Sequence, residues 1–498
     1  MADEPRTYNL IVIGGGPAGI NGATTARVLG KSVALIDRHH ELGGAGANTG
    51  TVPSKTLRET AVALSGLRSR DLYGVDLSLR REVTVGDFLR HERKVKSGLN
   101  AMLAQRLDAC DADVFYGEAS FQDPRTIRVR TIDRTQAKDE HKKHVASSED
   151  EVLLHGEKIL IATGSSPVRP STFPFGPGIY DSDTLLELEN VPGTMAVIGA
   201  GTIGSEYACT FATLGTKVHI IDGRDVLMSF LDGEISRALV KEMERLGIVF
   251  HWKERAETCT RGETTYPGGP GPIHLKLSSG LILTVDEVLV AAGRASATGR
   301  LNLPAAGVQL GDRGLIPVDD QFRTNISHIY AAGDVIGFPA LASTSMDQAR
   351  RAVRFAFGLT NDAVRTELMP HGIWTIPEIG MVGDTEESLK RKGIEYVVGR
   401  ASYAHNARGR IIGDTRGFLK LLFRLSDLEM VGAHVIGEQA TDVVHIGMMA
   451  MLARARADLF DELCFNLPTL GELYRFAAFD ALRAAGRLSE VTQANEFL

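Results

Sequence analysis

Cysteine is scarce in this sequence of 498 residues, and its placement argues against two kinds of site. The four cysteines lie far apart and form no CxxC pair: Cys110, Cys209, Cys259 and Cys464. Such spacing predicts neither a disulfide framework nor a zinc site. A chain without structural disulfides fits a reducing compartment, and we expect it in the cytoplasm.

Excess basic charge and long apolar runs are also lacking. The formal net charge is −7, so no overall positive field attracts nucleic acid or an anionic membrane. No apolar run approaches the roughly 18 residues that a membrane span needs. The chain reaches its first expected strand at Tyr8 without a charged and then apolar leader, so we expect no signal peptide. We therefore expect neither nucleic acid nor a membrane as a partner.

The composition that remains is that of a globular protein with several domains. Hydrophobic residues make up 43% and charged residues 23%, which is ordinary for a globular chain. The length suffices for about two to four domains with cores of their own. Residues 133–151 are polar and cannot contribute to a core, so we expect a solvated insertion there. A partner-binding loop is the alternative for that insertion.

A first dinucleotide-binding unit is predicted near the N-terminus. The apolar run 10–13 indicates a strand buried on both faces of a parallel sheet. The glycine-rich segment 14–19 follows at once, and its glycines allow the backbone to approach a pyrophosphate at a helix N-terminus. A second strand follows at 32–36, and Asp37 lies 23 positions after Gly14, where a carboxylate accepts from ribose hydroxyls. The residues expected to bind this nucleotide are Gly14, Gly16, Pro17, Ala18, Gly19 and Asp37.

The same pattern returns 185 positions later. A strand at 195–198 precedes the turn 199–204, and a further strand at 218–222 ends in an acid. Two complete units are much more specific than one, and they predict an α/β protein with two nucleotide-binding domains. The residues expected to bind the second nucleotide include Gly199, Gly201, Ile203, Gly204 and Asp222.

Residues 43–55, from Gly-Gly-Ala-Gly to Pro-Ser-Lys, closely resemble the redox-active segment of the flavin-dependent pyridine nucleotide disulfide oxidoreductases. The two cysteines of that family are replaced by Gly46 and Thr51. A dithiol exchange needs a thiolate and a second sulfur, so this segment keeps the flavin cradle and lacks the relay. The family's histidine is replaced by Leu467, which removes the general base. We interpret Thr469 and Glu472, just beyond it, as a capping box at a helix start, with a catalytic role for Glu472 as the alternative.

The resemblance extends over nearly the whole chain and implies its organisation. It implies an FAD domain at 1–192 and 292–364, an NAD(P) domain at 193–291 and a C-terminal α+β domain at 365–498 that forms a homodimer. The motif at 324–334 implies that the Asp334 carboxylate bonds a ribityl hydroxyl of FAD. Further residues implied at FAD are Gly43, Gly44, Lys55, Thr163, Gly164 and Asp334, and at NAD(P) Glu206 and Gly293.

The resemblance also implies one catalytic pair. Lys55 would lie beside flavin N5 and pair with Glu206, and a cation there stabilises the reduced, anionic flavin. Two surface helix residues are the alternative.

Nucleotide preference is partly readable at the end of the second unit. Asp222 is expected to accept from the 2′-hydroxyl of NAD and to repel a 2′-phosphate. Arg224 could offset that repulsion by pairing with the phosphate of NADP, or it could be a solvent-facing loop residue.

Hydride that reaches a flavin without a dithiol must leave by another route. The simplest route is back to a second nicotinamide, which is ping-pong transhydrogenation between NADPH and NAD. Segments such as 180–183, 334–343 and 372–379 look most like the soluble pyridine nucleotide transhydrogenases. Two alternatives stay open: an NAD(P)H dehydrogenase that reduces a quinone or another non-thiol acceptor, and a non-catalytic redox sensor that binds flavin and nucleotide.

Overall fold

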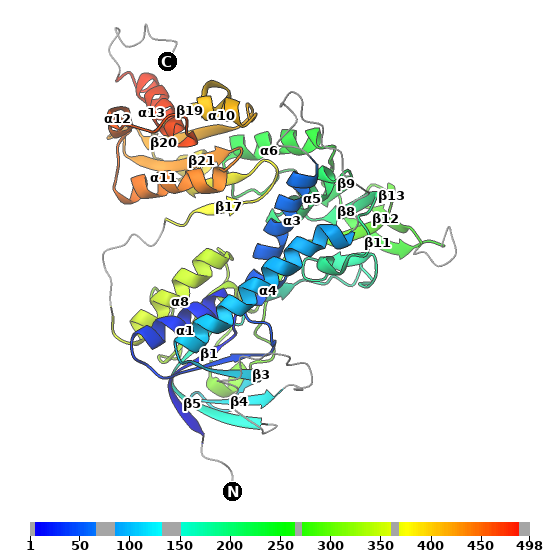
Figure 1. Cartoon of the computed structure of the whole chain (residues 1–498), viewed down its shortest axis with the longest axis vertical. Helices are drawn as coiled ribbons and strands as arrows, with labels where there is room; N and C mark the ends of the chain where they lie inside the picture. Colours follow the sequence, from blue (N-terminus) through cyan, green and yellow to red (C-terminus); the bar gives the residue numbers. More distant parts are fainter. Residues whose placement is uncertain (1–4, 66–84, 132–150, 264–270, 360–367, 488–498) are drawn as a thin grey trace.

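A computed structural model of the chain describes residues 5–65, 85–131, 151–263, 271–359 and 368–487. All of the expected insertion at 133–151 except its last residue lies outside these ranges. Figure 1 shows two mixed α/β bodies, with two helices running between them, and a C-terminal body. Within the described ranges, no helix has the length and apolar character that crossing a membrane requires.

The first body is built on a parallel sheet in which β1 lies between β2 and β5. β3 extends the sheet beyond β2, and β16 extends it beyond β5. Residues 10–13 of β1 are at most 3% exposed, which confirms a strand buried on both faces. The bounds are β1 Arg6–Ile13, β2 Val33–Asp37, β3 Asp113–Phe121, β5 Glu151–Ile161 and β16 Ile329–Ala331.

β3 and β5 each extend beyond this layer into an antiparallel meander with β4 (Thr126–Thr131). Helices α1 (Pro17–Val28) and α8 (Ala342–Ala356) pack against each other beside the parallel sheet (Figure 1).

The second body contains a parallel sheet in the order β10-β9-β8-β14-β7. Its edge strand β7 precedes residue 193, where we expected this domain to begin. An antiparallel sheet, β11-β12-β13, which no sequence motif indicates, packs against it through one apolar core. The strands are β7 Ile179–Asp181, β8 Thr194–Ile198, β9 Lys217–Asp222, β10 Val249–Trp252, β11 Ala256–Arg261, β12 Ile273–Leu277, β13 Ile282–Val285 and β14 Glu287–Val290; helices α5 Thr202–Thr213 and α6 Gly233–Arg245 belong with them.

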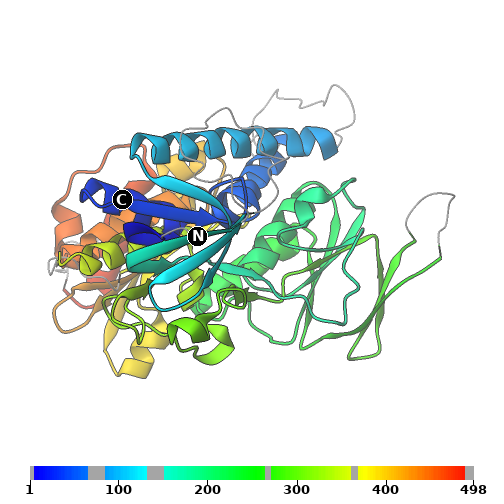
Figure 2. The same ribbon diagram turned by 90° about the horizontal axis from the view of Figure 1, so that it is seen from below.

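The chain passes between these two bodies through a two-stranded ribbon. β6 (Ser165–Pro167) leaves the first sheet and β15 (Arg294–Ser296) returns to it, paired antiparallel. The N–H of Val168 donates to the carbonyl of Gly293 at 3.0 Å. The outward and return crossings therefore lie at one place, between the two bodies that Figure 2 shows side by side from below.

The C-terminal body is an antiparallel sheet in the order β17-β18-β21-β20-β19, with helices beside it, which confirms the α+β expectation. Its strands are β17 His371–Ile373, β18 Ile379–Gly383, β19 Tyr396–Ser402, β20 Phe418–Arg424 and β21 Met430–Ile436; the helices are α9 Glu386–Lys392, α10 Ala407–Ile411, α11 Ala440–Leu452, α12 Ala457–Glu462 and α13 Leu473–Ala484.

Helix α3 (Thr51–Leu64) links all three bodies. It follows the short helix α2 (Gly44–Asn48) and packs against both α4 (Val85–Ala109) and α5. One apolar cluster includes side chains of α3, α4, the second sheet and the strands β17 and β18. The residues that follow the predicted glycine cradle therefore pack against the second nucleotide-binding body.

Candidate active site

Both predicted glycine turns form the same strand, turn and helix unit. Gly14 has φ +108° and Gly199 has φ +106°, a region that favours glycine. A Cβ on Gly19 would lie 1.7 Å from the carbonyl oxygen of Gly14, and a Cβ on Gly204 would lie 2.1 Å from that of Gly199. Glycine at these positions lets each helix start directly on the strand end, which is the arrangement that binds a pyrophosphate.

The two acids that follow these turns have matching environments. Asp37 Oδ2 accepts from the N–H of Gly15 at 2.6 Å, and Asp222 Oδ2 accepts from the N–H of Ala200 at 2.7 Å. Both carboxylates are buried. Each acid is thus fixed against the glycine turn of its own unit, at the position predicted for a ribose.

Asp222 is, in addition, ion-paired with an arginine. Arg224 Nε lies 2.9 Å from Asp222 Oδ1, and Nη2 lies 2.8 Å from Oδ2. Burial opposes ionisation of Asp222, but the hydrogen bonds from Arg224 and from the Ala200 N–H outweigh it and lower the pKa of the carboxyl to about 2. The Arg224 side chain is 54% exposed, so it can swing toward another anion.

The stretch that resembles a redox segment packs on the first glycine turn. The Gly43 N–H donates to the Gly15 carbonyl at 2.7 Å, and a Cβ on Gly44 would lie 2.9 Å from the Cα of Gly16. A Cβ on Gly46 would lie 2.7 Å from Cγ of Pro17. All four cysteines of the chain are free, and none lies in this stretch. The segment is therefore a close-packed backbone cradle without a thiol.

Lys55 and Glu206 meet between the bodies. Lys55 Nζ on α3 lies 2.5 Å from Glu206 Oε2 on α5, and the Glu206 side chain is only 7% exposed. The other oxygen, Oε1, accepts from the backbone N–H of Trp374 at 2.8 Å. The structure thus brings together the two residues predicted to pair, and it adds an anchor in the C-terminal body.

A hydrogen-bonded chain connects the crossing ribbon to Asp334. Ser165 Oγ donates to Asp334 Oδ2 at 2.6 Å, and Arg294 Nε donates to Ser165 Oγ at 2.8 Å. The Arg294 Nη1 group lies 3.1 Å from Asp183, which accepts from the Thr49 hydroxyl at 3.1 Å. Asp334 is therefore connected, through the ribbon of β6 and β15, to Thr49 in the segment 43–55.

Thr163, Gly164 and Gly293 lie next to this network of hydrogen bonds, directly before Ser165 and Arg294 in the sequence. The Thr163 hydroxyl is buried and finds no hydrogen-bond partner among the described residues. Gly164 has φ +69° and Gly293 has φ +112°. A buried polar atom without a protein partner fits a site completed by a ligand.

The expected capping box is wrong. Thr469 does precede a short 3₁₀ turn at Leu470–Glu472, but its hydroxyl donates to the carbonyl of Asn466 at 2.7 Å and caps nothing. Glu472 accepts from Asn406 at 3.3 Å. Leu467, which replaces the family's histidine, is 70% exposed in the single chain. The tertiary contact to Asn406 overrides the local sequence pattern at Glu472.

The sequence reasoning missed Arg58, one turn beyond Lys55. Its side chain is 2% exposed, donates to the Thr375 carbonyl at 3.1 Å and lies 3.2 Å from Glu378. Glu378 also accepts from the Thr441 hydroxyl at 2.8 Å. A charged residue three positions after Lys55 on a helix with an otherwise apolar inner face was the available indication.

Comparison with known families covers most of the chain. The family model described as pyridine nucleotide-disulphide oxidoreductase matches residues 8–353, and the model of that family's dimerisation domain matches residues 369–478.

Individual relatives agree with the family match. A soluble pyridine nucleotide transhydrogenase of Mycobacterium tuberculosis is 40% identical over 486 residues, which are 97% of this chain and 99% of the relative. One from Marinomonas sp. is 35% identical and covers 95% and 98%. Among solved structures, the HOCl-induced flavoprotein disulfide reductase RclA from Escherichia coli has a TM-score of 0.81 at 26% identity, covering 95% of this chain and 99% of that one. LpdA from Mycobacterium tuberculosis shares the fold, with a TM-score of 0.83 at 24% identity, covering 95% and 99%.

Proposed function

Because this chain belongs to the pyridine nucleotide-disulphide oxidoreductase family, we propose that it transfers hydride between NADPH and NAD through FAD, in a ping-pong reaction. One observation carries this proposal: Lys55 and Glu206 are paired beside the cradle, while Gly46, Thr51 and Leu467 stand where the family's thiol relay and its histidine would be. A donor nucleotide and an acceptor nucleotide then suffice. The transhydrogenases named above, similar along nearly their whole length, support it.

The residues of the first body fit FAD. The glycine turn and residues 43–55 packed on it offer a backbone cradle, and the Thr163 hydroxyl, which has no partner within the described ranges, offers a polar group. When bound, FAD would take up a hydride equivalent from one nucleotide and return it to the next. Lys55 would present a cation toward the cofactor, and Glu206 would hold that ammonium in place. The residues proposed to hold FAD are Gly14, Gly16, Pro17, Ala18, Gly19, Asp37, Gly43, Gly44, Lys55, Thr163, Gly164 and Asp334.

The second body fits NAD(P). Asp222 would accept from the ribose hydroxyls of NAD, whereas the exposed Arg224 would turn toward the 2′-phosphate of NADP. One site could thus serve both substrates of a transhydrogenase. The residues proposed to hold the nucleotide are Gly199, Gly201, Ile203, Gly204, Glu206, Asp222, Arg224 and Gly293.

Assembly and location complete the proposal. The match to a dimerisation domain at 369–478 supports a homodimer. We assign FAD to residues 1–192 and 292–364 and NAD(P) to residues 193–291, with β7 as an added edge strand of the latter. The free cysteines and the soluble relatives favour the cytoplasm.

Anaerobic turnover tests the proposed reaction. Purified protein is mixed with NADPH and the thio analogue of NAD, without oxygen or any other acceptor, and reduction of the analogue is followed by absorbance. Transfer at rates comparable to flavin reduction by NADPH is expected. If NADPH reduces the flavin and a quinone, but not the NAD analogue, reoxidises it, the protein is an NAD(P)H dehydrogenase. Flavin that NADPH does not reduce would point to a sensor.

A further inference from the structure

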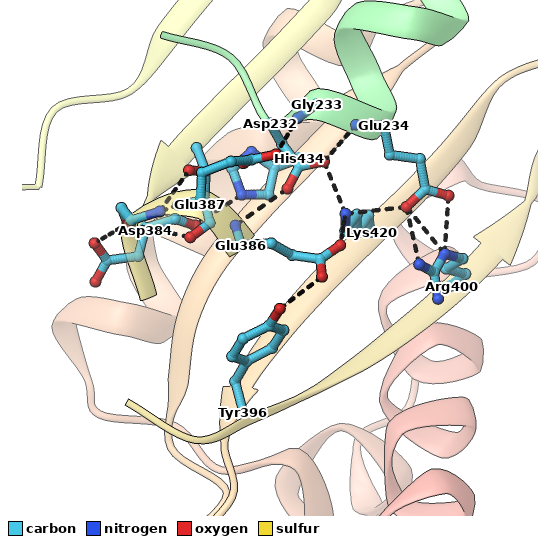
Figure 3. Close-up of polar contacts among 12 residues, drawn as sticks. Asp232, Gly233, Glu234, Asp384, Glu386, Glu387, Tyr396, Arg400, Lys420 and His434 are labelled. Atoms are coloured by element: carbon cyan, nitrogen blue, oxygen red, sulfur yellow. Dashed lines mark hydrogen bonds and ion pairs between the residues drawn. The ribbon is translucent and has the colours of Figure 1, made fainter. Parts of the chain in front are cut away.

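Lys420 lies at the centre of a buried group of charges. Its side chain is 0% exposed, and Nζ lies 2.7 Å from Asp232, 3.0 Å from Glu234 and 2.5 Å from Glu386. Figure 3 shows the ammonium between Glu386 on one side and the two acids of α6 on the other. We call these four residues the Lys420 cluster.

The Lys420 cluster joins the nucleotide-binding body to the C-terminal body. Asp232 caps α6 by accepting from the Glu234 N–H at 3.0 Å, and its other oxygen accepts from the Glu386 N–H at 3.3 Å. Lys420 comes from β20 and Glu386 opens α9. One lysine thus ties the N-terminus of α6 to two elements of another body.

The charges around Lys420 are balanced only with the lysine present. Arg400 donates to both oxygens of Glu234 at 2.9 Å, and the Tyr396 hydroxyl donates to Glu386 at 2.7 Å. The exposed Lys390 lies 3.8 Å from Glu386, so three carboxylates face three cations. Burial would raise the pKa of Asp232, but the hydrogen bond from Lys420 outweighs it, and the pKa is lowered. Without Lys420, one negative charge would be in excess.

The three carboxylates are also spaced as a cation site. One oxygen of each lies within 4.8 Å of the others. Lys420 Nζ lies within 3.0 Å of all three, so the ammonium takes the place that a divalent cation would take.

The cluster is connected to the predicted nucleotide site through one loop. Residues 223–231 run from Asp222 to Asp232 and carry Arg224. Ser236 Oγ on α6 donates to the Leu227 carbonyl at 2.6 Å and so fixes the middle of the loop to the helix. The position of α6 therefore bears on the loop that carries Arg224, whose own backbone is also held by Asp222 and by the N–H of Lys253.

We propose that Lys420 is a positioning residue for the nicotinamide nucleotide, which acts by holding α6 and the loop 223–231 in the arrangement that binds it. The proposal rests on the nucleotide-binding part of the proposed function. Without the ammonium, the carboxylates repel one another and only a fraction of molecules keep the competent arrangement, which weakens apparent binding. FAD retention depends on the other sheet and stays unchanged.

Anaerobic stopped-flow reduction of the bound flavin by NADPH tests this. For K420M holoenzyme, the half-saturating NADPH concentration rises about tenfold, while the limiting rate stays within about twofold and the flavin content is normal. The matched control is K392M, which removes an exposed lysine paired with Asp384 in the same body and leaves both values unchanged. An unchanged half-saturation in K420M overturns the proposal. Because no second nucleotide is added, the outcome is independent of whether the protein is a transhydrogenase.

A cation rescue separates charge from packing. K420A opens room among the three carboxylates, and CaCl₂ restores its half-saturation toward the wild-type value without affecting wild type. If the half-saturating NADPH concentration of K420A is raised and Ca²⁺ does not lower it again, the proposal is overturned. If both lysine variants fail to fold, E386Q keeps the lysine but weakens its tie to α9, which helps to hold α6 in place. Its half-saturation rises by about threefold, and no rise overturns the proposal.

Discussion

Arg224 and Asp222 lie two positions apart and close on each other through two contacts, Nε to Oδ1 at 2.9 Å and Nη2 to Oδ2 at 2.8 Å. Under the proposed function, the pair keeps the acid assigned to NAD and the cation assigned to NADP in one place. Because the arginine is half exposed, an arriving phosphate can draw it away, and a ribose diol can replace it on the carboxylate.

Replacing Arg224 with Met should therefore affect the two nucleotides differently. A charge-assisted hydrogen bond is worth about 1.5–3 kcal/mol, so the half-saturating NADPH concentration should rise about 10- to 100-fold. The half-saturating NADH concentration should stay the same or fall, because Asp222 no longer pairs with Arg224 and can accept from the ribose. Steady-state or stopped-flow titrations with both nucleotides measure this. Lys253→Met, which removes an exposed cation paired with Asp225, is the control, and equal losses for both nucleotides would refute the assigned role.

The pH dependence should likewise differ between the nucleotides. The pKa of Asp222 is lowered from 3.8 to about 2 in the folded state. The stability that its ion pair contributes is thus present above pH 3.8 and lost only as the pH falls toward 2. NADH half-saturation should be flat from about pH 5 to about pH 8, while NADPH should weaken below about pH 6, as its phosphate gains a proton. A transition in the NADH profile inside that range would contradict the ionised pair.

Lys55→Met should slow flavin reduction by NADPH while FAD stays bound. Losing one charged group in a partly desolvated site costs on the order of 2–4 kcal/mol, or roughly 10²–10³ in rate. The flavin potential should also fall. Glu206→Gln should be milder, because one oxygen can still accept from Trp374 or Lys55. Anaerobic stopped flow measures the rate, and a wild-type rate and potential in Lys55→Met would show that the pair is structural.

Disulfide substrates should not be turned over. Lipoamide and glutathione disulfide should give background rates in an NADPH-coupled assay, since all four cysteines lie outside the cradle. Adding thiols should also disturb the cradle, because a Cβ on Gly46 meets Pro17 at 2.7 Å. We expect Gly46→Cys with Thr51→Cys to lower flavin retention relative to Thr51→Cys alone. Disulfide reduction by the wild type at the rate of nucleotide exchange would refute the missing relay.

Arg58→Met should destabilise the protein by about 3–5 kcal/mol, because Glu378 would remain buried without its cation. Burial already raises the pKa of Glu378 even with Arg58 present. Thermal or urea unfolding of the holoenzyme measures the loss. Arg475→Met breaks an exposed pair with Asp461 and should change stability by less than about 1 kcal/mol. Equal effects of the two variants would show that the buried pair contributes no more than a surface one.

The sequence predicted the elements that have a strict local requirement. Gly19 and Gly204 indicate their turns because a side chain there would clash with the carbonyl of Gly14 or Gly199. Lys55 and Glu206 could be paired only through the family resemblance, since 151 positions separate them.

Features that depend on tertiary packing were not predictable in this way. Glu472 had the spacing of a capping box and bonds to Asn406 instead. Lys420 sits in an apolar strand pattern, and nothing local indicates the three acids that surround it. Its partners lie 188, 186 and 34 positions away, and only the packing of α6 and α9 onto β20 brings them together.

The hydrogen bond between Val168 and Gly293 has an evolutionary and practical consequence. Everything between these residues leaves and rejoins the chain at one point, so both of its covalent connections lie side by side. A segment from a relative with another nucleotide preference could be transplanted with two neighbouring splice joints. The flavin-binding frame would be left uncut, and coenzyme choice would become an exchangeable part of the molecule.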